Sequence, residues 1–250
     1  MDLYYETQGE GKPVVLIHSP GVDSREWTFV VPHLAAAHKV VTYDGRGTGR
    51  SPAPQRPTNL LDDLRSLLDE LGLASASLVG HSMGGQLAAE FALAHPERVD
   101  KLALIAPSLS GFAYSKTFTD WMNQVNSYAP DVRRMVDFSL SGPLYRTIMQ
   151  SPHRDLMQTL HSEYMNRVFT EWKSFEVVWP TPPAIERLER IEADTLFVRG
   201  TVEWDDMDRV AEEYRRIPSI RFEVVDGADH MLTITHGERL ADLLVRFLDG

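Results

Sequence analysis

A serine flanked by two glycines is the group best suited to chemistry in this chain. The pentapeptide Gly80-His81-Ser82-Met83-Gly84 follows an apolar run that ends at Val79, and it precedes an Ala-rich segment from Gly85 to His95. The apolar run predicts a buried strand and the Ala-rich segment predicts a helix, so the serine lies in the turn between them. Such a turn strains the serine backbone and places its hydroxyl at a helix N-terminus, where free N–H groups stabilise developing negative charge. The pattern is typical of a nucleophile elbow and predicts Ser82 as the nucleophile.

A serine nucleophile requires a general base, and the base requires a third group that orients it. His230 follows the last predicted strand, 220–225. It is therefore expected at the sheet edge where Ser82 lies and where ligands bind in such sheets. We predict His230 as the base. His18 and His81 flank turns of the predicted site, but histidines in such places are more often packed and hydrogen-bonded.

The acid that orients the base is expected after the strand that ends at Gly200. Three carboxylates are available there, those of Glu203, Asp205 and Asp206. The chain order would then be serine, acid, histidine. The alternative is a solvated acidic loop in which one of the three caps the following helix.

An oxyanion hole requires two backbone N–H donors. Met83, directly after the predicted nucleophile, is expected to supply one of them. The other is expected from the turn His18-Ser19-Pro20-Gly21, which follows the first long apolar strand.

Composition and charge restrict the class of protein. The chain has 250 residues, 43% hydrophobic and 24% charged, which is typical of a globular protein with one large core. Its formal net charge of −11 argues against nucleic acid and anionic membrane surfaces as partners. No apolar stretch approaches the roughly 18 residues of a membrane helix. Because the first residues also lack the pattern of a signal peptide, we expect a cytoplasmic protein.

The sequence predicts neither a metal nor a cofactor. There is no cysteine, which excludes disulfides, a thiol nucleophile and cysteine-bound zinc. The histidines and acidic residues show none of the spacings of metal ligands. Gly45-x-Gly47-x-Gly49 follows a predicted strand, but its spacing is wrong for a dinucleotide fingerprint.

Apolar runs and helical periodicity alternate along the chain, which predicts an α/β fold with a mostly parallel central sheet flanked by helices. Strands are expected at 3–7, 13–18, 39–44, 76–79, 100–106, 194–199 and 220–225, and helices at 27–37, 59–71, 85–95, 208–216 and 237–248. Between residues 111 and 183 there are only helical stretches, rich in Trp, Tyr, Phe and Met. We therefore predict a core of residues 1–110 and 184–250 and a helical cap, or lid, of residues 111–183.

Several segments outside the predicted cap together resemble the α/β-hydrolase fold family, in particular its capped serine esterase, enol-lactonase and haloperoxidase-like members. In chain order they are His18-Ser19-Pro20-Gly21 with Trp27, Tyr43 to Ser51, Gly80 to Gly85, His95 to Val99, and Gly227 to His230. The resemblance implies the fold of that family and a triad that contains Ser82 and His230. It does not indicate the substrate.

Two positions depart from the pattern of the family. The residue that matches Pro20 usually donates its N–H to the oxyanion, and proline has none. The second donor is therefore expected from Gly21 or from a side chain such as that of Ser19. The family's usual Gly-x-x-Asp places Glu203 where an aspartate is expected, which favours Glu203 as the acid and leaves Asp205 as the alternative.

These features predict a cofactor-free serine hydrolase that cleaves a small carboxylic ester or lactone. The same triad would serve carbon–carbon bond hydrolysis, perhydrolysis or acyl transfer. Outside catalysis, the alternative is a ligand-binding protein with little turnover. Serine at position 82 argues against dehalogenase and epoxide hydrolase chemistry, for which members of the family use an aspartate there. The oligomeric state is not indicated.

Overall fold

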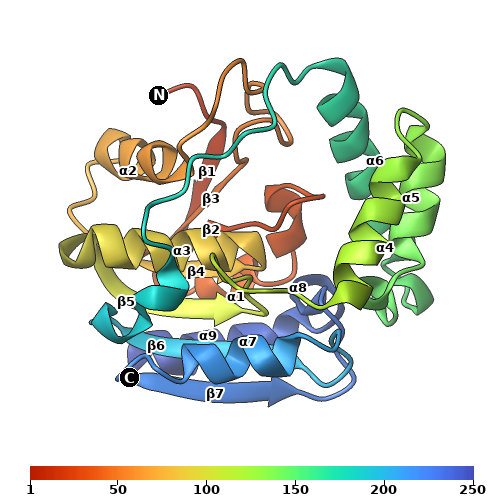
Figure 1. Ribbon diagram of the computed structural model, residues 1–250. Helices are drawn as coiled ribbons and strands as arrows, with labels where there is room; N and C mark the ends of the chain where they lie inside the picture. Colours follow the sequence, from red (N-terminus) through yellow and green to blue (C-terminus); the bar gives the residue numbers. More distant parts are fainter.

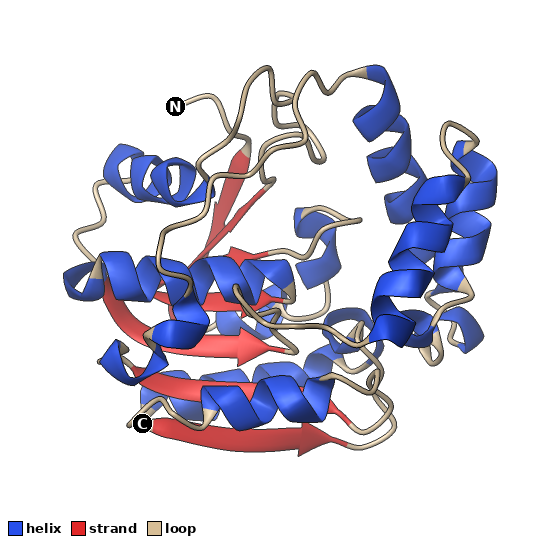
Figure 2. Ribbon diagram, in the orientation of Figure 1, coloured by secondary structure: helices blue, strands red, loops and turns tan.

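A twisted seven-stranded sheet forms the centre of the molecule (Figures 1 and 2). The computed structural model describes residues 1–250. The strand order is β1-β3-β2-β4-β5-β6-β7, and β1 alone is antiparallel to its neighbour. The strands are β1 (Tyr5–Gln8), β2 (Lys12–Ile17), β3 (His38–Tyr43), β4 (Ala76–His81), β5 (Val99–Ile105), β6 (Asp194–Gly200) and β7 (Ile220–Val225). The predicted α/β class with a mostly parallel sheet is confirmed.

Helices cover both faces of this sheet, as the continuous apolar runs of the central strands require. They are α1 (Val31–Leu34), α2 (Leu60–Glu70), α3 (Met83–Ala94), α7 (Met207–Tyr214), α8 (Leu232–Thr235) and α9 (Gly237–Asp249). In Figure 1, α3 and α7 lie in front of the sheet and α9 lies behind it. None of the helices combines the length and the apolarity that crossing a bilayer requires.

Local signals in the sequence determine where α2 begins and ends. The Asn59 side chain accepts hydrogen bonds from the N–H groups of Leu61 and Asp62, which satisfies two free donors of the first turn. Gly72, at a φ of +66°, follows the C-terminus. The leucines between them repeat at helical spacing and are buried on one face.

The prediction of one helix over residues 27–37 is wrong. The structure has a 3₁₀ turn at Ser24–Trp27 and then only the short helix α1. Pro32 lies within this stretch and has no N–H to donate to a residue one turn earlier, so a helix cannot continue through it.

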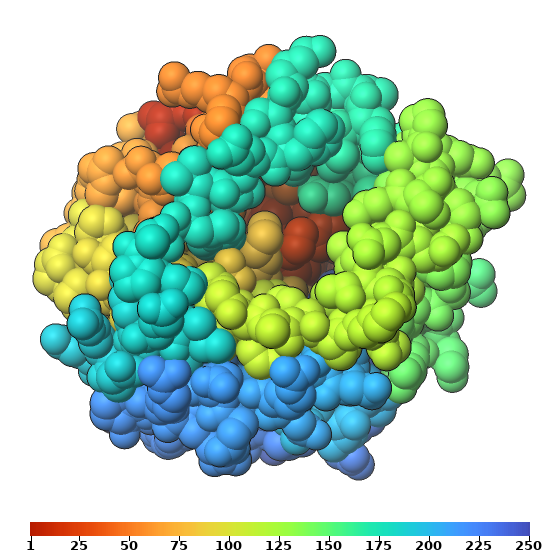
Figure 3. Space-filling view, viewed as in Figure 1, coloured from red at the N-terminus to blue at the C-terminus, as the bar shows by residue number.

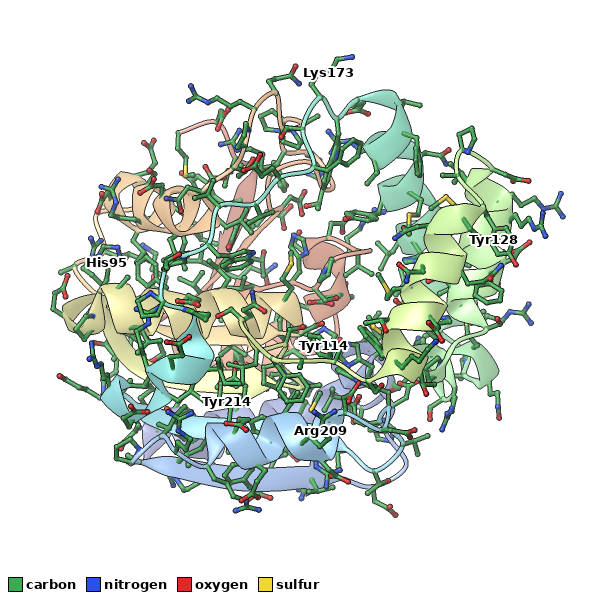
Figure 4. All side chains as sticks on the ribbon, viewed as in Figure 1. His95, Tyr114, Tyr128, Lys173, Arg209 and Tyr214 are labelled. Atoms are coloured by element: carbon green, nitrogen blue, oxygen red, sulfur yellow. The ribbon has the colours of Figure 1, made fainter.

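A second group of helices, between β5 and β6, lies over the carboxyl ends of the parallel strands (Figure 2). It contains α4 (Lys116–Ser127), α5 (Val132–Leu140) and α6 (Arg154–Thr170), with α5 packed against both others. We call residues 111–183, which contain these helices, the cap segment. After α6 the chain returns past the core: the N–H of Lys173, labelled in Figure 4, donates to the carbonyl of Pro54 at 2.9 Å.

Candidate active site

Ser82 lies in a sharp turn between β4 and α3, with φ +55° and ψ −120°. Few residues other than glycine adopt a positive φ, so the turn stores strain that its surroundings must hold. Backbone hydrogen bonds hold it: Ser82 N–H donates to Ile105 at 2.9 Å, and its carbonyl accepts from Gly85, Gln86 and Ser108 at 2.9–3.1 Å. A serine in a strained turn between a strand and a helix has the geometry of a nucleophile elbow.

Glycines flank the turn because its backbone segments approach closely. A Cβ on Gly80 would lie 2.3 Å from the carbonyl oxygen of Gly84, and a Cβ on Gly84 would lie 2.4 Å from that of Ile17. Both separations are shorter than any non-bonded contact allows, and the neighbours are backbone atoms that cannot turn aside. The two glycines of the motif are therefore required by packing.

Ser82 and His230 line the same cavity, which has a volume of about 510 Å³ and lies between the sheet edge and the cap segment. In Figure 3 a hollow opens toward the viewer, with parts of the N-terminal and α3 regions at its bottom. Neither the Ser82 hydroxyl nor Nε2 of His230 is hydrogen-bonded to a protein group. Both atoms are thus free to act on a bound molecule.

The structure has no group of three or more histidine or acidic side chains arranged to hold a metal ion.

Glu203 is the carboxylate that lies against His230, with 3.2 Å between its Oε2 and Nδ1 of the imidazole. Both side chains are almost fully buried, at 3% and 5% exposure. Asp205 is exposed and makes no ion pair or hydrogen bond. Asp206 is buried and accepts from the N–H of Ser115, at 2.9 Å, and from Arg209 at 2.7 Å. Of the three candidate carboxylates, the structure thus brings Glu203 to the imidazole.

The predicted oxyanion donors lie at the same cavity, which Pro20, Gly21 and Met83 all line. Met83 is the first residue of α3, and neither its N–H nor that of Gly21 is engaged by a protein acceptor. Ser19 differs, because its N–H and its hydroxyl both donate to the Glu26 carboxylate at 3.0 Å. The free backbone donors beside Ser82 are therefore those of Met83 and Gly21.

A buried network that the sequence did not reveal connects Ser19, in the turn after β2, to the loop that carries His230. Glu26 is fully buried, and its Oε2 lies 3.1 Å from Nδ1 of His81, whose Nε2 lies 2.8 Å from the carbonyl oxygen of His230. A carboxylate and a carbonyl only accept hydrogen bonds, so the His81 ring donates from both nitrogens and is cationic. Burial acts to lower the pKa of His81, but Glu26, the His230 carbonyl and Glu203 together outweigh burial, and the pKa is raised. The Glu26–His81 pair thus contacts both the turn that contains Ser19 and the loop that carries His230.

The expectation that His18 and His81 are packed and hydrogen-bonded agrees with the contacts of both. His18 Nδ1 lies 2.7 Å from the carbonyl oxygen of Ser19, and its Nε2 accepts from the N–H of Gly45 at 2.8 Å. The sequence did not indicate a buried role for Glu26, since a glutamate in a short helical stretch usually faces solvent. Its partner His81 lies 55 positions away, a separation that no local pattern spans.

The cap segment also reaches the turn that contains Gly21. His161, on α6, donates from Nδ1 to the Gly21 carbonyl at 3.1 Å, and its Nε2 accepts from the Ser139 hydroxyl at 3.0 Å. Burial lowers the pKa of His161, and the Gly21 carbonyl opposes this only in part. A neutral imidazole suits this arrangement, because one nitrogen donates and the other accepts.

Comparisons with known proteins place this geometry in a family. The model of the alpha/beta hydrolase fold matches residues 12–237. A protein of Caulobacter vibrioides described as a carbamate hydrolase is 30% identical over 99% of this chain and 96% of its own length. A protein of Azorhizobium caulinodans with the same description is 40% identical over 107 residues, which are 42% of this chain and 40% of that protein.

A solved structure shares the fold over its full extent. The enol-lactonase of Burkholderia xenovorans superposes with a TM-score of 0.81 at 21% identity, over 99% of this chain and 96% of that one. At that identity the likeness concerns the fold alone. The family model that matches residues 12–237, with the relative 30% identical over 99% of the chain, shows that this chain belongs to the α/β-hydrolase fold family.

Proposed function

We propose that the protein is a serine hydrolase that cleaves a carboxylic ester or a lactone through an acyl-enzyme. One observation carries the proposal: a serine in a strained elbow shares a cavity with a histidine whose other nitrogen is 3.2 Å from a buried glutamate. Nucleophile, base and orienting acid are the parts that acyl transfer by a serine requires.

The proposed reaction follows from the free atoms at the site. Ser82 Oγ attacks the carbonyl carbon while Nε2 of His230 takes its proton, and Glu203 stabilises the imidazolium that forms. The oxyanion accepts from the N–H of Met83, with Gly21 as the second donor. His230 then protonates the leaving alkoxide, and water, deprotonated by the same imidazole, releases the acid and restores Ser82.

Hydrolysis of a carbamate is the second candidate, because relatives of this chain carry that description. It would use the same serine and the same oxyanion donors, since a carbamate also passes through a tetrahedral intermediate at its carbonyl carbon. The two candidates differ in the acyl group, so one panel of 4-nitrophenyl esters and 4-nitrophenyl carbamates separates them.

The test of the proposal is turnover of such a panel by the pure protein and its variants. Ser82→Ala and His230→Ala should each lower kcat by about 10³-fold or more, since the members of a triad act as a unit. Ser108→Ala, which removes another hydroxyl of the same cavity, should retain activity. A fluorophosphonate should add once, at Ser82. Activity of Ser82→Ala within tenfold of the unmodified protein, with both proteins folded by circular dichroism, would contradict the proposal.

A further inference from the structure

The cavity beside Ser82 has no Asp, Glu, Lys or Arg side chain in its wall. It is lined by 27 residues, of which 17 are hydrophobic. Its tyrosines stay neutral, because burial raises the pKa of Tyr114 and brings that of Tyr164 to about 12. Figure 4 labels Tyr114 where the chain passes from the sheet edge to α4. An ionised substrate group would find no counter-charge in this wall.

The mouth of the cavity is apolar as well. Among the large hydrophobic side chains of the chain, six are exposed, and three of these line this cavity. They are Met122, Phe169 and Phe175, at 39%, 39% and 64% exposure. Apolar side chains that gather at an opening favour the entry of an apolar molecule, which removes them from water.

The wall contains a few polar groups without a partner in the protein, among them the Gln86 amide and the indole N–H groups of Trp121 and Trp204. Gln86 lies one turn after Ser82 on α3, is only 9% exposed, and makes no side-chain hydrogen bond within the protein. A hydrogen bond from a ligand to this amide would be stabilising, because the rest of the wall is mostly apolar. Asn126 also lines the cavity, but at its exposed end.

From these observations we infer the substrate class: an electroneutral ester with a bulky apolar group that packs under the cap segment and a polar atom that binds the Gln86 amide. Anionic substrates are rejected for two reasons. A carboxylate would lose its hydration without gaining a counter-charge, and the net charge of −11 repels anions from the whole molecule. The inference rests on the proposed ester hydrolysis and adds the selection by charge.

The first experiment compares two esters that share a leaving group and differ in charge. We expect kcat/KM for 4-nitrophenyl nonanoate to exceed that for the mono-4-nitrophenyl ester of suberic acid by about 100-fold or more. The reactive carbonyl and the leaving group are the same, so the ratio reports binding of the chain end. Equal kcat/KM values for the two esters would overturn the inference.

The second experiment tests Gln86 with a nearly isosteric pair of butyrate esters, those of choline and of 3,3-dimethylbutanol. The unmodified protein should favour the neutral ester. Gln86→Glu puts a carboxylate into the wall and should raise the choline-to-neutral ratio of kcat/KM by about tenfold or more. The matched control is Asn126→Asp, which adds the same charge at the exposed end, where solvent screens it, and should leave the ratio near its original value. A ratio unchanged in Gln86→Glu would contradict the assigned role of Gln86.

The outcomes of these experiments separate the two proposals. If no ester in the panel is hydrolysed in a Ser82-dependent manner, the proposed function fails. If esters are hydrolysed through Ser82 but charged and neutral members react equally fast, the proposed function stands and the substrate class is wrong.

Discussion

At the scale of single residues, the orientation of the His230 ring depends on which carboxylate it meets. Glu203 approaches Nδ1 to 3.2 Å in a place that water hardly reaches, whereas Asp205 points to solvent two residues later. A glutamate is one methylene longer than the aspartate usual in this family, and here that length is compatible with direct contact to the imidazole.

The pair of variants Glu203→Gln and Asp205→Asn tests this difference. Glu203→Gln keeps the shape but removes the charge that stabilises the imidazolium, so kcat should fall by about 10²-fold or more. Asp205→Asn removes an exposed charge of the same sign and should change kcat by less than about threefold. The measurement is kcat for a 4-nitrophenyl ester at saturating concentration. The opposite ranking would assign the acid to Asp205.

The sequence predicts a role for those site residues whose neighbours along the chain form a pattern. Ser82 is recognised by the glycines that its turn requires, and His230 by its place after the last strand. The choice between Glu203 and Asp205 stayed open in the sequence, because both follow β6 within reach of the site and only side-chain direction separates them. Glu26 could not be found at all, since its role exists only where the turn after β2 meets His81.

At the scale of elements, the loop that carries His230 is fastened to the cap segment by one side chain. Asp229 is fully buried, and its carboxylate accepts from the N–H groups of Thr147, Ile148 and Met231 at 2.7, 2.9 and 3.1 Å. The first two donors belong to the cap segment, and the third follows His230. Asp229, the neighbour of the proposed base His230, therefore connects the core to the cap segment. The cavity lies between these two parts.

Replacing this carboxylate should affect stability and turnover together. Asp229→Ala leaves three N–H groups without acceptors and should lower the free energy of unfolding by about 3 kcal/mol or more. It should also reduce kcat/KM, because the His230 loop and the cap segment lose their common anchor. The matched control is Asp226→Ala, which removes an exposed carboxylate bonded to Thr201 on the same loop. Thermal unfolding and ester kinetics of both variants check this. Equal behaviour of the two variants would show that the anchor has no effect.

The strands and most core helices could be predicted because each has a periodicity of its own. The cap segment could be predicted as helical, but its arrangement could not. Its positions are fixed by backbone donors such as Thr147 meeting side chains of the core, and such long-range pairs leave no repeat in the sequence. Residues 27–37 have a helical composition, but Pro32 limits the helix in this stretch to the short α1.

At the scale of the whole molecule, two buried histidines with opposite pKa shifts connect the site to the stability of the fold. The pKa of His81 is raised by Glu26 against the effect of burial, and that of His161 is lowered by burial. In the unfolded chain both titrate near pH 6.5. The His81 pair contributes its full stability below that pH and loses it as the pH rises through the higher folded pKa. The contribution of His161 to the free energy of unfolding decreases as the pH falls below 6.5, because the unfolded chain then binds a proton that the folded protein does not.

The contribution of the His81 pair can be isolated with Glu26→Gln. Removing the carboxylate leaves burial as the dominant influence, so His81 becomes neutral and the folded protein loses the bound proton. The variant should be less stable than the unmodified protein by roughly 3 kcal/mol at pH 6, as expected for breaking a buried ion pair. This difference should shrink as the pH rises toward 9, while the His161 contribution, common to both proteins, cancels. The measurement is the midpoint of thermal unfolding of both proteins at several pH values.

The matched control for this prediction is a second fully buried glutamate whose charged partner does not titrate in that range. Glu90 accepts from the N–H of Ala184 at 2.9 Å and pairs with Arg187 at 2.7 Å, away from Ser82. An arginine stays charged throughout, so Glu90→Gln should cost stability by an amount that is the same at pH 6 and pH 9. The contrast between a pH-dependent loss in Glu26→Gln and a constant loss in Glu90→Gln would establish His81 as the titrating partner. A constant loss in both variants would mean that His81 is already neutral at pH 6 and that its contact with Glu26 is a hydrogen bond to the carboxylate and not an ion pair.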